Sequence, residues 1–200
     1  MSIYVVLFGG FQASKSDMAL WLASAQKQRK DVDFDAFPYL GATSDDAGAI
    51  SGFSKQFAGV IKKIEGSGAD PTYIVGHSSG CAIANELDSR LKDHDHIALV
   101  ALDGFPPDAS QMKRSNTQVW SATTPDYDKR KKLGNASLNY EKLLGRIGAP
   151  RLQVYKPTGV TTTWALHFYL VNAAATNKIK TTKDLNIGYA ACAANLGWLK

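Results

Sequence analysis

Short apolar runs alternate with segments of helical periodicity along this chain, and that alternation limits the possible folds more than any other feature. Residues 3–8 (IYVVLF) and 72–76 (TYIVG) are almost continuously apolar, which is typical of strands buried on both faces. Residues 31–37 alternate polar and apolar side chains, and residues 96–104 form another apolar run. Strands separated by helices build βαβ units, so we predict an α/β fold with a mostly parallel sheet and helices on both faces.

Further helices and strands continue this pattern. We expect helices at residues 14–28, 44–66, 81–91 and 137–144, a helix at the beginning of 167–176, and a moderately helical end at 184–199. Two later strands are expected at 117–122 and 151–156. The 200 residues are 44% hydrophobic, which is enough for one substantial core, so we predict one domain spanning residues 1–200.

Composition argues against several classes of function. The net charge of +5 comes from scattered lysines and one run at 129–132, without the interleaved aromatic residues of nucleic-acid readers. Cys81 and Cys192 are too few for a disulfide scaffold and lack metal-ligand spacing. The apolar part of "MSIYVVLFGGF" is too short for a signal peptide or a membrane span. We expect a cytoplasmic protein with no cofactor, no metal, no nucleic-acid partner and no membrane association.

The segment "GHSSG" (residues 76–80) matches the pattern G-x-S-x-G and lies between an apolar strand and an amphipathic helix. That context is the one a nucleophile elbow requires, because glycines let the strand turn sharply into the helix and expose the central serine. The start of the following helix would also direct free N–H groups toward a developing oxyanion. We therefore interpret Ser78 as a nucleophile; the alternative is a serine that only caps the helix.

A serine nucleophile needs a base, and the chain has four histidines. His77 is adjacent to Ser78 and leaves the chain in another direction. His94 and His96 lie at the amino end of the apolar run IALVALD, and parallel sheets gather their sites at the opposite, carboxyl ends of their strands. Elimination leaves His167, whose alternative interpretation is a histidine packed in the core.

Two aspartates are candidates for the acid that orients the imidazole. Asp103 closes the apolar strand after the elbow helix, although an Asp-Gly pair is also a common way to begin a turn. Asp126 follows the next expected strand. The chain order Ser78, Asp103, His167 matches the order in α/β-hydrolases, but the residues alone leave both acids open.

Three segments, "GHSSG", "LVALDGFPP" and "WALHF", resemble the thioesterase branch of the α/β-hydrolase superfamily, the domains that release acyl chains from polyketide and peptide synthases. The resemblance extends from residue 3 to about 171. It implies that Asp103 is the acid, with Ser78 and His167 in the other two roles. The segment "FGGFQAS" resembles the oxyanion loop of hydrolases, which implies that the Phe11 and Ser79 amides bind the oxyanion.

The chain departs from that family where a helical lid usually follows the strand that carries the acid. Only residues 104–116 are present there, which is too short for two lid helices and predicts an open, shallow cleft with a minimal lid. The aromatic residues expected to line it are Phe11, Phe105, Trp120 and Trp164.

We thus expect a serine hydrolase that cleaves a small-molecule acyl thioester or ester, carrier-bound or free, through an acyl-enzyme. The alternatives are a small-molecule carboxylesterase and a non-catalytic binding protein on a hydrolase fold.

Overall fold

Six parallel strands form one sheet at the centre of this computed structural model, which describes residues 2–41, 50, 52–68, 70–92, 95–104, 116–122, 152–155, 163–174, 178–190 and 193–200. The sheet order is β2-β1-β3-β4-β5-β6, and every pairing between neighbours is parallel. The strands are β1 (Ile3–Phe8), β2 (Val32–Phe37), β3 (Thr72–His77), β4 (Ile97–Leu102), β5 (Gln118–Ala122) and β6 (Leu152–Tyr155). The predicted parallel sheet and all of its strands are confirmed.

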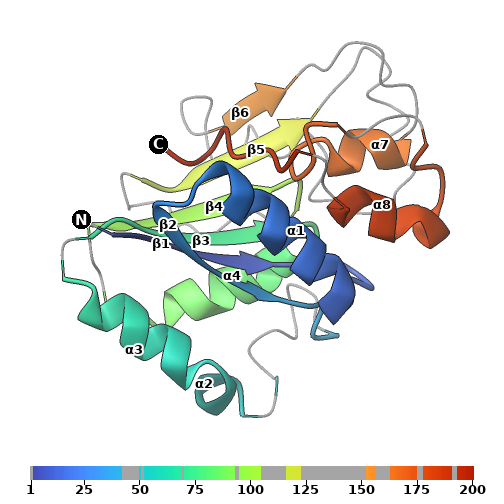
Figure 1. The fold of residues 1–200 in the computed structure, drawn as a ribbon. Helices are drawn as coiled ribbons and strands as arrows, with labels where there is room; N and C mark the ends of the chain where they lie inside the picture. Colours follow the sequence, from blue (N-terminus) through green and yellow to red (C-terminus); the bar gives the residue numbers. More distant parts are fainter. Residues whose placement is uncertain are drawn as a thin grey trace.

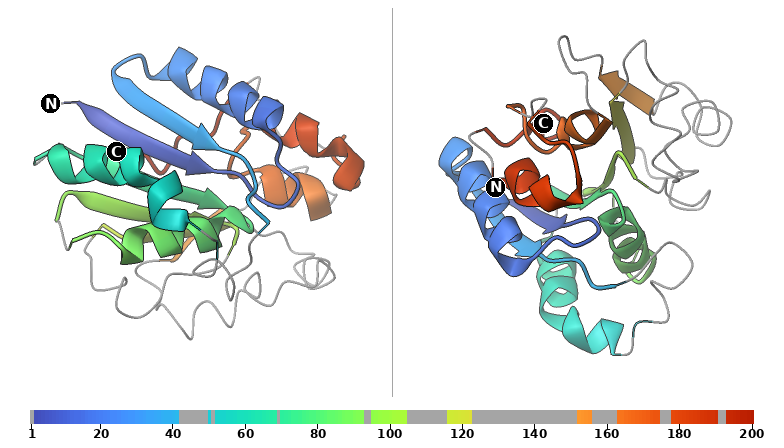
Figure 2. Two further views of the ribbon diagram at one scale, coloured as in Figure 1. Left: turned by 90° about the horizontal axis from the view of Figure 1, so that it is seen from below. Right: turned by 90° about the vertical axis from the view of Figure 1, so that its right-hand side faces the viewer.

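Helices cover both faces of the sheet (Figures 1 and 2). One face packs against α1 (Lys15–Gln28), α7 (Thr163–Phe168), α8 (Leu185–Tyr189) and the last residues of the chain. The other face packs against α2 (Phe53–Gln56), α3 (Ala58–Gly66) and α4 (Gly80–Ser89). The predicted arrangement of helices on both faces is therefore confirmed.

Strand β1 shows why its sequence is continuously apolar. Successive side chains of a strand point to opposite faces of the sheet. Val5 and Leu7 accordingly lie in the core shared with α1, whereas Val6 and Phe8 lie in the core shared with α3 and α4. Both sets are buried, so a polar residue at any of these positions would be buried without water.

The expected helix at 44–66 is shorter than predicted. Residues 42–49 and 51 lie outside the described part, but Ile50 is not helical and Gly52 has a left-handed φ of 71°. Helix α2 begins only after Gly52, and Phe57 separates it from α3. The hydrophobic periodicity that predicted one long helix is real, because Phe53 and Phe57 are both buried. The backbone nevertheless turns at Gly52, so the helix does not extend toward residue 44.

The two helices expected near the end of the chain are also wrong in extent. Helix α7 begins before His167 and ends at Phe168. A 3-10 turn (η5, Thr182–Asp184) precedes α8, which ends at Tyr189. The observed helix therefore covers only the first part of the range 184–199 that was predicted to be helical. Residues beyond both helices pair with each other instead, through an antiparallel bridge between Asn172 and Ala194.

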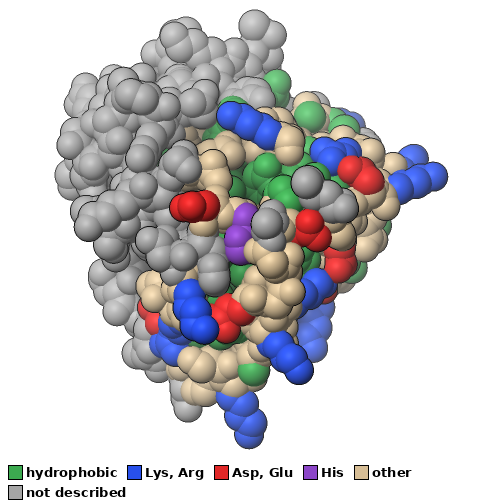
Figure 3. Space-filling view, turned by 90° about the vertical axis from the view of Figure 1, so that its left-hand side faces the viewer, with side chains coloured by type: hydrophobic (Ala, Val, Ile, Leu, Met, Phe, Trp, Pro, Cys, Tyr) green, Lys and Arg blue, Asp and Glu red, His purple; other side chains and the backbone are tan. Residues whose placement is uncertain are grey.

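All strands point the same way, and α7 and α8 lie at the side of their carboxyl ends (Figure 1). The opposite side, at the amino ends, shows Lys and Arg side chains interspersed with Asp and Glu around a hydrophobic area (Figure 3). His96 belongs to that amino edge, where its Nε2 lies 3.3 Å from Ser67 Oγ. In the described ranges, no helix combines the length and the hydrophobicity needed to cross a bilayer.

Several sequence predictions fall on residues outside the described part. These are the helix at 137–144, the basic run at 129–132, Phe105, most of the lid segment, His94, Asp126 and Cys192.

Candidate active site

Ser78 lies in a sharp turn between β3 and α4, as the motif predicts. Its φ is 55°, a left-handed conformation that L residues rarely adopt, and its side chain is half-buried. The amide of Ser78 donates to the carbonyl of Leu102 at the end of β4, at 3.0 Å. This bond anchors the turn to the neighbouring strand and holds Ser78 at the carboxyl edge of the sheet.

The two outer glycines of the motif are required by close packing of backbone. A Cβ on Gly76 would overlap the backbone of Cys81 in α4, and a Cβ on Gly80 would overlap the carbonyl oxygen of Phe8. Helix α4 thus crosses directly over β3 and β1, which is possible only without side chains at these two positions. The predicted strand–turn–helix elbow is what the structure shows.

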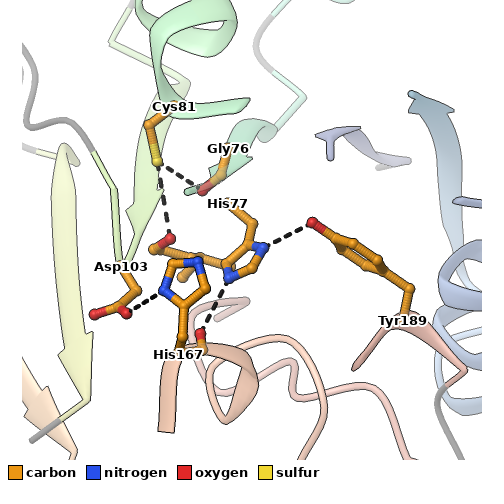
Figure 4. Close-up of polar contacts among 7 residues, drawn as sticks. Gly76, His77, Cys81, Asp103, His167 and Tyr189 are labelled. Atoms are coloured by element: carbon orange, nitrogen blue, oxygen red, sulfur yellow. Dashed lines mark hydrogen bonds and ion pairs between the residues drawn. The ribbon is translucent and has the colours of Figure 1, made fainter. Parts of the chain in front are cut away.

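Asp103 and His167 form a buried pair beside the elbow (Figure 4). Asp103 follows β4 directly, and its Oδ2 lies 2.7 Å from Nδ1 of His167 in α7. A carboxylate only accepts hydrogen bonds, so Nδ1 carries the hydrogen and the lone pair is left on Nε2. The pair therefore presents the tautomer that a general base requires. Asp126, the other candidate acid, lies outside the described residues.

The loop after β1 meets the elbow serine. A Cβ on Gly10 would lie 2.7 Å from the Cβ of Ser78, so the glycine lets the loop approach the serine closely. Within the described part of the chain, the amides of Phe11 and Ser79 donate to no other residue. The same holds for the hydroxyl of Ser78, which makes no hydrogen bond with His167 in this structure. Such bonds often tighten only when substrate binds.

Backbone strain gathers at this edge of the sheet. Among described residues, the non-glycine residues with positive φ are Gln12 (62°), Ser78 (55°) and Asp103 (51°). Each follows the carboxyl end of a strand: β1, β3 and β4 respectively. Strained residues of this kind cluster at functional sites, where the surrounding structure holds them in place.

The aromatic residues predicted to line a cleft divide into two groups. Phe11 is 50% exposed and packs edge-on against Tyr39, with 5.4 Å between ring centroids. The Trp164 ring lies 6.0 Å from the His167 ring. Trp120 reaches the site through its backbone carbonyl, which accepts from the Asp103 amide at 2.8 Å, while its indole N–H donates to Gln118. The Trp164 side chain thus lies beside the site, whereas the Phe11 ring packs against Tyr39, after β2.

The His77 side chain points away from Ser78 into the protein, as the sequence indicates, and both of its ring nitrogens have hydrogen-bond partners. Its Nδ1 lies 2.8 Å from the Tyr189 hydroxyl, and its Nε2 lies 3.0 Å from the carbonyl oxygen of His167. Burial, together with the neighbouring His167, lowers the pKa of His77 to about 3, so its imidazole is neutral. Sequence reasoning missed Tyr189, because no local pattern links residues separated by 112 positions.

Within the described part of the chain, no three His, Cys, Asp or Glu side chains gather as they would around a metal ion. A parallel sheet with helices on both faces and a strained serine elbow at its carboxyl edge form an α/β-hydrolase fold. This is the fold class that the sequence predicts.

Comparisons with known proteins give distant structural likenesses only. No family model matches the chain, and no curated protein sequence is similar to it. A protein from Xanthomonas campestris pv. campestris described as a hydrolase of the α/β superfamily is 11% identical, with a TM-score of 0.48 over 78% of this chain and 86% of that chain. Esterase PE8 is 17% identical, with a TM-score of 0.45 over 78% of this chain and 82% of that chain.

Phospholipase PlaB from Legionella pneumophila is 17% identical to this chain, with a TM-score of 0.35. The matched region covers 56% of this chain and 27% of that phospholipase. The function proposed next therefore depends on the geometry of the site.

Proposed function

We propose that this chain is a serine hydrolase that cleaves an acyl thioester or ester, with Ser78 as nucleophile, His167 as general base and Asp103 as the orienting acid. The observation that carries the proposal is the buried bond of 2.7 Å between Asp103 and His167, next to a serine held at positive φ. A buried aspartate that fixes an imidazole tautomer beside an elbow serine is the arrangement that acyl transfer requires.

The proposed reaction has two halves. Oγ of Ser78 attacks the acyl carbon while its proton moves to Nε2 of His167, and the carbonyl oxygen becomes an oxyanion. The bond to the leaving sulfur or oxygen then breaks, and His167 returns the proton to that atom. Water attacks the acyl-enzyme in the same way, which releases the acid and regenerates the Ser78 hydroxyl. Asp103 stabilises the imidazolium in both halves.

The oxyanion needs donors that are already in place. The Phe11 and Ser79 amides have no other acceptor in the described part of the chain, and they belong to the two segments that flank Ser78. Removing one such donor in a serine hydrolase costs about 10²–10³ in kcat, so two aligned amides would supply a large share of the acceleration.

The substrate proposed is a small acyl thioester or ester with an apolar acyl group. The Trp164 ring lies beside His167, and the exposed Phe11 ring, on the loop after β1, offers further apolar surface at this edge of the sheet. The resemblance to thioesterases favours a thioester, carrier-bound or free. Turnover of pantetheine or CoA thioesters compared with p-nitrophenyl esters separates a thioesterase from a carboxylesterase.

A fluorophosphonate probe tests the nucleophile directly. We expect the probe to label the wild-type protein on Ser78, located by peptide mass mapping, and we expect Ser78→Ala to abolish both labelling and ester hydrolysis. Ser54→Ala, on α2 in the other helical layer, is the matched control and should label as the wild type does. A wild-type protein that neither labels nor hydrolyses any acyl substrate would favour the non-catalytic binding protein.

A further inference from the structure

His77 sits next to the proposed nucleophile, yet its ring faces the base. The centroid of its ring lies 4.6 Å from that of His167 (Figure 4). It also lies 4.9 Å from the ring centroid of Phe168. The side chain is fully buried and both ring nitrogens have polar partners. A buried histidine with two partners and no part in the proposed chemistry needs a separate explanation.

Only one assignment of donors and acceptors is consistent with the two contacts of His77. The carbonyl of His167 can only accept, so Nε2 of His77 carries the hydrogen, and its Nδ1 must accept from the hydroxyl of Tyr189. That hydroxyl in turn accepts from the Gly10 amide, at 2.8 Å. Donors and acceptors thus run in one chain from the loop after β1, through Tyr189 and His77, to the main chain of His167.

The contact at His167 meets a specific need of α7. The last carbonyls of a helix have no partner within the helix, and α7 ends at Phe168, one residue after His167. The His167 carbonyl receives its donor from His77. This bond fixes the peptide plane that follows His167, and with it the direction in which the imidazole leaves the helix.

At the other end of this series of hydrogen bonds, packing holds Tyr189 in place. The Tyr189 ring is buried and packs against Trp21 of α1 and Phe168 of α7, with centroids 5.6 Å and 5.2 Å away. Burial raises the pKa of the Tyr189 hydroxyl above its usual range, so the O–H remains a donor. Because the pKa of His77 is lowered to about 3, the hydrogen-bond pattern is the same at any pH at which the enzyme would work.

We propose that His77 is a positioning residue that holds the backbone of the base His167, and that Tyr189 couples this support to the loop carrying the oxyanion donor Phe11. The inference rests on the proposed function, since it assigns His77 a task only if His167 is the base. Asp103 orients the imidazole from one side, and His77 holds the backbone from the other.

Two amide substitutions separate this role from simple packing. The side-chain nitrogen of Gln is as many bonds from Cα as Nε2 of His, so His77→Gln keeps a donor for the His167 carbonyl. Asn ends one bond earlier, so His77→Asn can satisfy Tyr189 but cannot reach His167. Each variant is measured for kcat and KM on a p-nitrophenyl ester, with active sites titrated by fluorophosphonate so that kcat refers to folded protein only.

We expect His77→Gln, which keeps the donor to His167 but loses the acceptor for Tyr189, to lower kcat per titrated site by about 3- to 10-fold, as Tyr189→Phe does. We expect His77→Asn to lower it by about 10- to 100-fold with little change in KM, because small misplacements of a base are costly. Tyr189→Phe keeps the packing against Trp21 and Phe168 and removes only the hydroxyl, and we expect it to lower kcat by about 3- to 10-fold. If His77→Asn gives no titratable protein, Tyr189→Phe takes its place in the comparison.

Equal kcat per titrated site in the wild type, His77→Asn and Tyr189→Phe would overturn the positioning role, even if the unfolding temperature fell. Equal losses in His77→Gln and His77→Asn would overturn it too, because then the donor at Nε2 would be irrelevant. Failure of the wild type to label at Ser78 is a different result, which rejects the proposed function itself.

Discussion

Asp103 carries its carboxylate from a backbone position that costs energy to maintain. A non-glycine residue at positive φ costs on the order of 1–3 kcal/mol, and it persists only when its surroundings hold it. The Asp103 amide donates to the Trp120 carbonyl of β5 at 2.8 Å, and this bond holds the turn. Gly104 follows because a Cβ there would overlap the carbonyl oxygen of Ser78. The backbone that follows the proposed acid thus lies directly against the backbone of the proposed nucleophile.

This geometry gives a first prediction at the residue scale. Asp103→Asn should lower kcat by two to four orders of magnitude, roughly scaled from the about 10⁴-fold loss when a triad aspartate becomes asparagine, because the imidazole then adopts the wrong tautomer. Asp126→Asn should change kcat by less than about tenfold, since its position after Pro125 in a charged segment suits a solvated side chain. Steady-state kinetics on both variants, with circular dichroism to check folding, measures the difference.

The reverse outcome is equally clear. If Asp126→Asn were the crippled enzyme and Asp103→Asn stayed active, the acid would belong to the segment after β5, and the bond between Asp103 and His167 would be structural only.

At the scale of elements, glycines decide how closely α4 packs on the sheet. Gly80→Ala places a methyl group against the carbonyl of Phe8, a backbone atom that cannot move without displacing β1. We expect this variant to lose about 1–3 kcal/mol of unfolding free energy, the usual cost of overpacking. Gly59→Ala in α3 is the matched control: its new methyl group would meet nothing within 4 Å.

The control should change stability in the opposite direction. Alanine is favoured over glycine inside a helix by about 0.5–1 kcal/mol, so Gly59→Ala should raise the unfolding free energy by roughly that amount. Urea unfolding followed by circular dichroism measures both variants. A Gly80→Ala protein as stable as the wild type would show that α4 can shift away from β1, and that the close crossing of the elbow is not required for folding.

The elements that the sequence predicted correctly are those whose signal is local. The strand at 72–76 is almost continuously apolar because both its faces are buried, and Ser78 is recognisable because the elbow needs glycines at fixed positions around it. The position of Asp103 follows from the end of a strand. These features depend on neighbours in the sequence, so a single chain displays them.

Features that depend on distant partners were not predictable. The chain after Tyr189 looks helical, but Ala194 instead donates to Ser24 Oγ of α1 at 2.9 Å and accepts from the Gln28 side chain at 2.9 Å. The hydrogen bond between His77 and Tyr189 is of the same kind. Periodicity records which residues are apolar, and it carries no information about which remote group satisfies a buried polar atom.

At the scale of the whole molecule, the sheet order brings the site together. Loops after β1, β3 and β4 meet because these three strands are neighbours and all run in the same direction. Parallel sheets place their sites at such carboxyl ends, outside the layers of helices. The C-terminal segment closes the core on one face, where the Lys200 carbonyl accepts from the Tyr73 hydroxyl at 3.2 Å. In the proposed hydrolase, the residues that act on substrate therefore come from the loops at the carboxyl edge.

The half-exposed Phe11 ring and the short segment 104–116 together predict how acyl length affects turnover. Each methylene that becomes fully buried contributes about 0.8 kcal/mol, roughly fourfold in kcat/KM, whereas methylenes left in water contribute almost nothing. We expect p-nitrophenyl esters to gain over the first few carbons, which contact Phe11 and Trp164, and then to level off. A series from acetate to dodecanoate, measured below the critical micelle concentration, gives the slope per methylene. A steady severalfold gain out to the longest chain would reveal an enclosed acyl tunnel and reject the open cleft.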